Sequence, residues 1–186
     1  FITPEKGITP VALEDMAERL VETVSRRVSH CHYRTQMVKF GDMMFLSQYL
    51  RGEEPGPFRK AVQQFWKLNL FTPYLEGAKQ HFGFVAMRMP QGFLITARGS
   101  NKENPPPEDI VYVPKVDFQD RIIYIAPRKK ASLNANVAAR IFQDRPDVDL
   151  ILHAHIFPGV ENRTGYDYAP GTREDEEEVL KYLSHG

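Results

Sequence analysis

Two histidines one residue apart, His153 and His155, are the residues of this sequence that most directly suggest chemistry. They end the apolar segment 147–155, whose aliphatic composition after Pro146 predicts a buried strand. Side chains two apart on a strand point to the same face, so the two imidazoles would project together and could bind one metal ion. On a helix, the same spacing would separate them by roughly 200°. The spacing therefore favours a metal site, and two ordinary strand-end histidines are the alternative.

Other histidines and acids are weaker candidates for chemistry. His30, Cys31 and His32 follow a predicted helix, and we interpret them as a helix end with surface histidines. The acidic run 174–178 lies at the start of another predicted helix, where the helix dipole stabilises carboxylates. We therefore expect a solvated helix end there rather than a cluster of metal ligands.

The composition is that of a soluble globular protein. The chain has 186 residues, 42% hydrophobic and 26% charged, which is enough for one domain with a substantial core. Lys plus Arg equal Asp plus Glu at 24 each, which argues against a general binder of nucleic acid or of an anionic membrane. The apolar runs are too short to span a bilayer, and no signal peptide is visible. Cys31 is the single cysteine, so we expect a cytoplasmic protein without an internal disulfide.

The first 55 residues predict a helical extension. Apolar side chains recur at helical spacing within 10–30, and a second apolar segment at 43–50 is expected to form a short helix. The stretch 51–57, rich in glycine and proline, interrupts this pattern. We therefore predict an extension at 1–55 and a separate domain at 56–186.

The elements that must position the two histidines lie within that domain. A helix is expected at 58–70, and Ser132 and Thr172 are expected to cap two later helices. Before the histidine strand, further strands are expected at 82–88, 92–96, 110–113 and 121–125, the first two joined by a hairpin. This order predicts a mixed α/β layer structure rather than a repeating βαβ fold.

Several motifs, taken in order, resemble the class II aldolase/adducin family, which includes sugar-phosphate aldolases, epimerases and a dehydratase. They are Gly83-Phe-Val-Ala-Met-Arg88, Gly92-Phe-Leu-Ile-Thr-Ala-Arg-Gly99, Pro107-Glu-Asp-Ile-Val111, His153-Ala-His155 and Tyr168-Ala-Pro-Gly-Thr172. The resemblance extends from about residue 58 to residue 172. It implies an α/β domain of three α/β/α layers with a mixed, largely antiparallel central sheet, here preceded by the helical extension.

The resemblance also implies a divalent metal. In the family, the two histidines and a third, distant histidine bind the ion, usually Zn²⁺, which acts as a Lewis acid on a carbonyl group. In this chain His153 and His155 match the pair. His185 is the candidate for the third ligand, and His81 is a weaker one.

Two positions are named as candidate catalytic residues from the same resemblance. The family's acid–base glutamate falls on Asn134, and an amide cannot exchange a proton near neutral pH. Tyr168 is a possible proton donor, by analogy with tyrosines near the family's active sites. A family asparagine that helps to hold substrate phosphate is replaced by Phe84.

Four positions are candidates for substrate binding: Thr96, Arg98, Gly99 and Ser132. Arg98 replaces a Ser or Thr of the family, and its guanidinium could bind a phosphate or carboxylate through charge. Ser132 remains from a pair of serines.

Three functions compete. The first is a metal-dependent lyase or isomerase that acts on a small hydroxylated carbonyl compound such as a sugar phosphate, and the retained histidine pair favours it. The second is a catalytically inactive, adducin-like assembly module, which the change to Asn134 favours. A metal enzyme with another reaction is the third, because fold does not determine function. We expect the first. The resemblance implies a homo-oligomer, while the balanced charge and the short apolar runs argue against a nucleic-acid or membrane partner.

Overall fold

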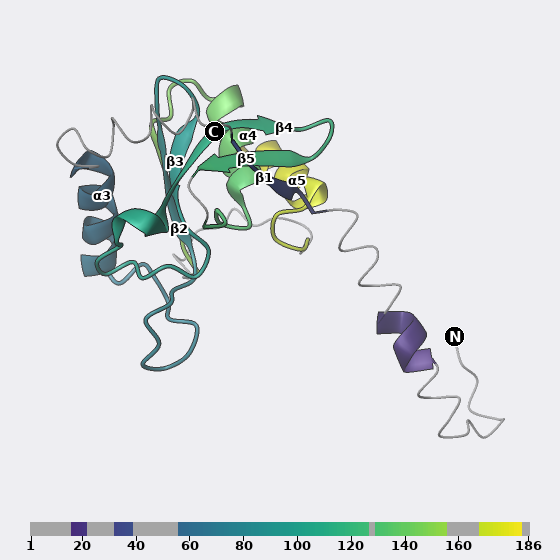
Figure 1. Cartoon of the computed structure of the whole chain (residues 1–186), viewed down its shortest axis with the longest axis horizontal. Coiled ribbons are helices and arrows are strands. Elements are labelled where there is room, and N and C mark those ends of the chain that lie inside the picture. The colour runs from purple at the N-terminus through teal and green to yellow at the C-terminus, as the bar shows by residue number, and fades with distance from the viewer. Residues whose placement is uncertain (1–15, 22–31, 39–55, 127–128, 156–167, 184–186) are drawn as a thin grey trace. The chain divides into compact units, whose positions relative to one another are not determined.

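The computed structural model describes residues 16–21, 32–38, 56–126, 129–155 and 168–183 (Figure 1). The chain divides into two compact units, Phe1–His32 and Tyr33–Gly186. In the first unit, residues 16–21 are helical, within the helix predicted at 10–30. The helix predicted at 43–50 lies outside the described residues, as does Cys31. No described helix is long and apolar enough to cross a membrane.

A six-stranded sheet with the strand order β1-β5-β4-β3-β2-β6 is the centre of the second unit (Figure 1). Its strands are β1 (Arg34–Met37), β2 (Phe84–Arg88), β3 (Phe93–Thr96), β4 (Ile110–Asp117), β5 (Ile122–Ala126) and β6 (Leu150–His153). Every pair of neighbours is antiparallel except β1 and β5. The predicted mixed, largely antiparallel sheet is confirmed.

Strand β1 was not predicted. Arg34–Met37 pairs in parallel with β5, with Arg34 beside Ile122 and Met37 beside Ile125. All four residues of this edge strand are exposed, and they lack the apolar alternation that reveals a half-buried strand. The helical interpretation of the first 55 residues is therefore wrong for this segment, while the boundary between residues 55 and 56 stays a prediction.

Helices cover both faces of the sheet. The helices are α3 (Gly56–Lys67), α4 (Ala135–Asp144) and α5 (Arg173–Leu183), and the 3₁₀ turn η1 (Pro107–Asp109) precedes β4. On one face, Phe58 and Val62 of α3 pack with Leu94 and Tyr112. Because successive strand residues point to opposite faces, their neighbours Phe93 and Ile95 pack on the other face, against Ala138 and Phe142 of α4. The structure thus has the three layers expected.

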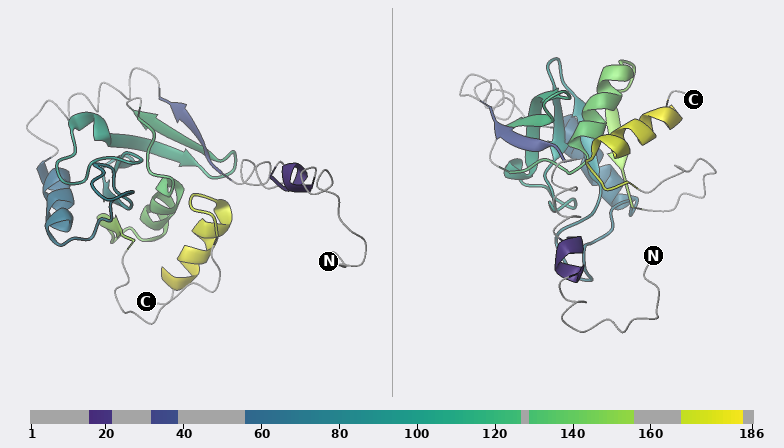
Figure 2. Two further views of the ribbon diagram at one scale, coloured as in Figure 1. Left: turned by 90° about the horizontal axis from the view of Figure 1, so that it is seen from below. Right: turned by 90° about the vertical axis from the view of Figure 1, so that its right-hand side faces the viewer.

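Helix α5 packs beside α4, and the left view of Figure 2 shows it away from α3. Thr172 caps α5, since its Oγ1 accepts a hydrogen bond from the backbone N–H of Asp175 over 3.3 Å. That predicted cap is confirmed. The predicted cap of α4 is wrong, because Asn134 rather than Ser132 is the N-cap residue and no side chain forms the capping hydrogen bond. Ser132 instead accepts from the N–H of Ala135 through its carbonyl oxygen.

The strands predicted around the hairpin form as expected. Strands β2 and β3 pair antiparallel, with Met87 beside Leu94. Gly92 closes the hairpin with φ +69°, and a Cβ at this position would lie 2.1 Å from Val113 O. Glycine is therefore required at this turn.

Strand β6, which carries the first histidine, forms the sheet edge beside β2. Phe84 pairs with His153, and Met87 pairs with Leu150. The side chain of Arg88 binds the segment before β6: its Nε donates to Val148 O and its Nη2 to Arg145 O, over 2.9 and 2.8 Å. These hydrogen bonds help to set where β6 begins along β2, and thereby where the histidines lie.

Candidate active site

A cavity of about 260 Å³ lies where several loops meet the end of β6. Six of the residues named from the sequence line it: Arg98, Gly99, Ser132, Asn134, His153 and His155. The structure therefore brings together residues from three separate segments.

The two histidines converge within this cavity. His153 Nε2 and His155 Nε2 lie 3.0 Å apart. The ring of His153 stacks on Phe84 with 5.2 Å between centroids, and that of His155 stacks on Phe82 with 5.0 Å. Because each imidazole lies against a phenyl ring, the planes of both rings are defined by packing.

Gly83 allows β6 to approach β2 at the position of His153. Its φ is +84°, and a Cβ there would lie 2.4 Å from His153 O. A side chain would therefore push the histidine strand away. Beyond the strand, Thr72 Oγ1 donates to His155 O over 3.3 Å, which holds the backbone of the second histidine.

The histidine pair suits a divalent metal as two of its ligands. Burial, followed by the nearby His155, lowers the pKa of His153 to about 4. At neutral pH its imidazole is uncharged, which is the form that binds metals. Zinc bonds imidazole nitrogens at about 2.0–2.1 Å, so two nitrogens in a tetrahedral site lie about 3.3 Å apart. The 3.0 Å between the two Nε2 atoms is slightly shorter than this distance.

The described residues supply no third ligand. They contain no group of three or more His, Cys, Asp or Glu side chains arranged to hold a metal. His185 lies outside the described part of the chain, so its role stays a prediction. His81 is buried beside Trp66, and its Nδ1 accepts from the N–H of Lys102 over 3.4 Å.

An isolated bridge between Ala97 and Ala131 brings the candidate anion-binding residues together. Arg98 N donates to Lys130 O over 3.0 Å in the same pair of segments. Arg98 is exposed and Ser132 half-buried, and both line the cavity.

Thr96 does not reach the cavity. It is fully buried in β3, and its Oγ1 accepts a hydrogen bond from the N–H of Val85 over 3.3 Å. Tyr168 is 40% exposed and does not line the cavity either. The substrate-binding role of Thr96 and the proton-donor role of Tyr168 therefore stay predictions.

Asn134 lies in the cavity wall immediately before α4. Its Oδ1 is buried and has no hydrogen-bond partner among the described residues. This amide oxygen thus has no partner in the described part of the chain, and it cannot accept a proton at neutral pH.

The sequence interpretation missed one carboxylate of the cavity, that of Asp175. Its helix approaches the loop before α4 closely: Gly171 has φ +78°, and a Cβ there would lie 2.3 Å from Leu133 O. The signal in the sequence was the capping residue Thr172, which places Asp175 in the first turn of α5.

The prediction that residues 174–178 are solvated is wrong for two of them, since Glu176 and Glu178 are buried. Glu176 Oε2 accepts hydrogen bonds from Tyr33 OH and Asn136 Nδ2, over 2.9 and 3.1 Å. Burial raises the pKa of Glu176, although these hydrogen bonds oppose the shift. The acidic run could not reveal that α5 packs against α4, since that contact is tertiary.

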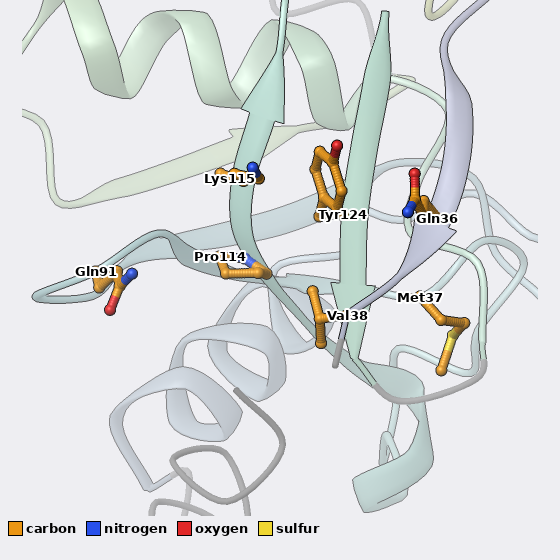
Figure 3. A pocket seen from close by; sticks show the side chains of 7 residues that line it. All are labelled: Gln36, Met37, Val38, Gln91, Pro114, Lys115 and Tyr124. Atoms are coloured by element: carbon orange, nitrogen blue, oxygen red, sulfur yellow. The ribbon is translucent and has the colours of Figure 1, made fainter. Parts of the chain in front are cut away.

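A larger cavity of about 360 Å³ lies elsewhere on the sheet, over β1, β5 and β4 (Figure 3). Figure 3 shows Lys115 and Tyr124 on neighbouring strands, and Lys115 Nζ lies 4.3 Å from the centroid of the Tyr124 ring. No imidazole or carboxylate is found among the described residues that line it. Of the two cavities, the smaller one is therefore the one that offers imidazole ligands for a metal ion.

Residues 72–159 match the family model described as the class II aldolase and adducin N-terminal domain. The matched segment contains strands β2 to β6 and both histidines. No curated protein matches the chain.

Two solved structures resemble the protein. YgbL from Escherichia coli, a candidate aldolase/epimerase/decarboxylase, has a TM-score of 0.50 and 16% identity, covering 73% of this chain and 70% of that one. This likeness shows the fold. L-fuculose-1-phosphate aldolase from Thermus thermophilus has a TM-score of 0.39 and 25% identity, covering 53% of this chain. The present chain spans 43% of that aldolase.

Proposed function

We propose, from the match of residues 72–159 to the class II aldolase and adducin domain, that the chain is a divergent metal-dependent lyase or isomerase. Its substrate would be a small hydroxylated carbonyl compound such as a sugar phosphate. The observation that carries the proposal is the 3.0 Å separation of His153 Nε2 and His155 Nε2 within a cavity.

His153 and His155 would hold the divalent ion, with Zn²⁺ as the leading candidate because zinc is commonly bound by imidazole nitrogens. An ion held there would supply Lewis-acid chemistry at a substrate carbonyl oxygen. His185 is proposed as the third ligand. The low pKa of His153 supports this role, since no proton has to be displaced at neutral pH.

The cavity suits a small, anionic substrate. Its volume of about 260 Å³ is below the roughly 300–1,000 Å³ of pockets for drug-sized ligands. Arg98 at the rim would bind a phosphate or carboxylate through charge-assisted hydrogen bonds, and Ser132 would add a hydroxyl donor. Asn134 would accept a hydrogen bond from a substrate hydroxyl group through its unpartnered Oδ1.

An inactive assembly module is not favoured. Assembly alone gives no reason for two imidazoles to converge inside a cavity that also holds an arginine and a serine. We also propose a homo-oligomer that acts in the cytoplasm, to which the single cysteine is suited. A strictly monomeric mass by light scattering would contradict the oligomer.

The test is the divalent metal content of the purified protein, compared with that of the His153→Ala and His155→Ala variants. We expect bound metal in the parent protein and its loss in both variants. Aldol cleavage and epimerisation are then screened on pentulose and hexulose phosphates. Absence of bound metal, together with unchanged stability in both variants, would overturn the proposal.

A further inference from the structure

We infer that the carboxylate of Asp175 is the acid–base catalyst of this cavity, the role that Asn134 cannot fill. Asp175 lines the same cavity as the two histidines and Asn134. The inference rests on the proposed function, because it assigns the proton carrier of that reaction.

Residues at the N-terminus of α5 orient the carboxylate of Asp175. Gly171 N–H donates to Oδ2 over 3.2 Å, and the N–H of Asp175 donates to Thr172 Oγ1 over 3.3 Å. Oδ1 has no hydrogen-bond partner among the described residues. One oxygen is thus held by the protein and the other is available to a substrate.

Helix α5, which carries Asp175, contacts both α4 and the loop before it, which carries Asn134. Asn136 Nδ2 donates both to Thr172 O, over 3.2 Å, and to Glu176 Oε2, over 3.1 Å. The close approach of Gly171 to Leu133 O adds a second point of contact. Asp175 is therefore positioned on a packed helix, as a catalytic group requires.

The surroundings of Asp175 suit proton exchange. The other ionisable groups that line the cavity are Tyr74, Arg98, His153 and His155. Burial raises the pKa of Asp175, while the hydrogen bond from Gly171 acts in the opposite direction. A raised pKa brings a carboxyl group closer to the pH at which it can both accept and return a proton.

The remaining acids of α5 do not compete for this role. Glu176 is engaged by Tyr33 and Asn136 away from the cavity, and Glu177 is exposed and paired with Arg173 over 2.7 Å. Among the described acidic side chains, Asp175 is the one that lines the cavity.

In aldol cleavage, Asp175 would remove the proton from the hydroxyl group β to the substrate carbonyl. The O–H electrons then form the new C=O bond, the Cα–Cβ bond breaks, and its electron pair passes into the enediolate of the other fragment. Asp175 returns the same proton to the enediolate carbon. The reaction yields two carbonyl fragments with no net gain or loss of protons.

The first arm of the test uses the zinc-loaded full chain and dihydroxyacetone phosphate in deuterated water. Exchange of the carbon-bound hydrogen is followed by NMR. We expect Asp175→Asn to slow exchange by about 100-fold or more, the size of a general acid–base contribution. Glu177→Gln, a matched change on the exposed side of α5, should leave the rate within about twofold of the parent.

A rescue variant separates catalysis from folding. Adding Asn134→Glu to Asp175→Asn returns a carboxylate to the lining of the cavity, so we expect part of the exchange rate to return. Exchange that survives Asp175→Asn within about fivefold would overturn the inference and leave the proposed function intact.

The second arm does not depend on activity. The carboxyl carbons of Asp175 and Glu177 are titrated by NMR, with and without Zn²⁺. A cation held by the histidine pair should lower the pKa of Asp175 and leave Glu177 unchanged. Zinc binding without any effect on Asp175 would overturn the inference alone, whereas a parent protein that neither binds zinc nor exchanges hydrogen overturns the proposed function and the inference together.

Discussion

Asn136 Nδ2 donates a hydrogen bond to Glu176 Oε2 over 3.1 Å, and this contact joins the two helices that border the candidate active site. The same carboxylate accepts from Tyr33 OH over 2.9 Å, and Arg140 Nε lies 3.7 Å from its other oxygen. A buried carboxylate with these partners positions α5, and with it Asp175, against α4.

Glu176→Ala should destabilise the protein by about 1–3 kcal/mol, because it leaves the buried amide of Asn136 and the hydroxyl of Tyr33 without their acceptor. The free energy of unfolding in urea measures this effect. Glu177→Ala, on the exposed side of the same helix, is the control and should change stability by less than about 0.5 kcal/mol. Equal effects of the two variants would contradict the role given to Glu176.

Gly83→Ala should reduce both stability and zinc binding. The alanine Cβ would meet His153 O, and its positive φ adds backbone strain, so we expect a loss of about 1–3 kcal/mol or more. Gly77→Ala is the matched control, because Gly77 also has a positive φ but an added Cβ there would have no atom within 4 Å. Calorimetric zinc titration of both variants checks the prediction, which is wrong if zinc affinity falls equally in the two.

Acid should destabilise the metal-free protein through its buried histidines. Burial and then the charge of Lys102 lower the pKa of His81 in the folded state, so the unfolded chain binds its proton more readily. The contribution of neutral His81 to the free energy of unfolding is fully present above about pH 6.5 and is lost as the pH falls below that value. For a single protonating group, the free energy of unfolding can fall by at most about 1.4 kcal/mol per pH unit.

Urea unfolding at pH 7 and pH 5 measures this dependence. His153, whose pKa is lowered to about 4, acts in the same direction, so the His81→Gln variant should retain part of the pH dependence. A variant with the same pH dependence as the parent would show that His81 does not contribute.

Zinc should raise the melting temperature of the protein, and a chelator should reverse the rise. At a free zinc concentration about 100 times the dissociation constant, the stabilisation is about 2.7 kcal/mol. The His155→Ala variant should lose this response because it removes one of the two converging nitrogens. His81→Gln, at a histidine outside the cavity, should keep it, and a response that persists in His155→Ala would place the metal elsewhere.

Arg98→Ala should weaken the binding of inorganic phosphate to the zinc-loaded protein by roughly 10- to 100-fold, the value of a charge-assisted hydrogen bond. Lys130→Ala is the control, since Lys130 is exposed in the adjoining segment but does not line the cavity. Competition by phosphate in a substrate-binding titration provides the measurement. Similar losses in both variants would indicate general charge attraction rather than a site at Arg98.

Much of the fold could be predicted because its signals are local. The β2–β3 hairpin, helix α3 and the Thr172 cap each depend on residues within a few positions of one another. Strand β1 could not be predicted in this way. Its four exposed residues carry no apolar pattern, and it is a strand because its backbone pairs with β5, far along the chain.

The candidate site likewise has features that the local sequence predicted and features that it could not predict. Strand alternation predicted that His153 and His155 would project together, because side chains two apart on a strand share a face. Their Nε2 atoms do converge, although β6 ends at His153 and His155 follows it. The same alternation is no guide to Thr96 and Arg98, because Thr96 is buried at the end of β3 whereas Arg98 is exposed beyond that strand. It could not place either residue relative to a cavity.

The sequence alone therefore determined the histidine pair, the order of the elements from α3 to α5 and the absence of a carboxylate at Asn134. Only the tertiary structure decided that α5 packs on α4, which buries Glu176 and brings Asp175 into the cavity of the histidines. The physical reason is that hydrophobic periodicity and helix-capping motifs depend on residues that are close together in the sequence. The partner that covers a helix face is chosen by packing between segments that are distant in sequence.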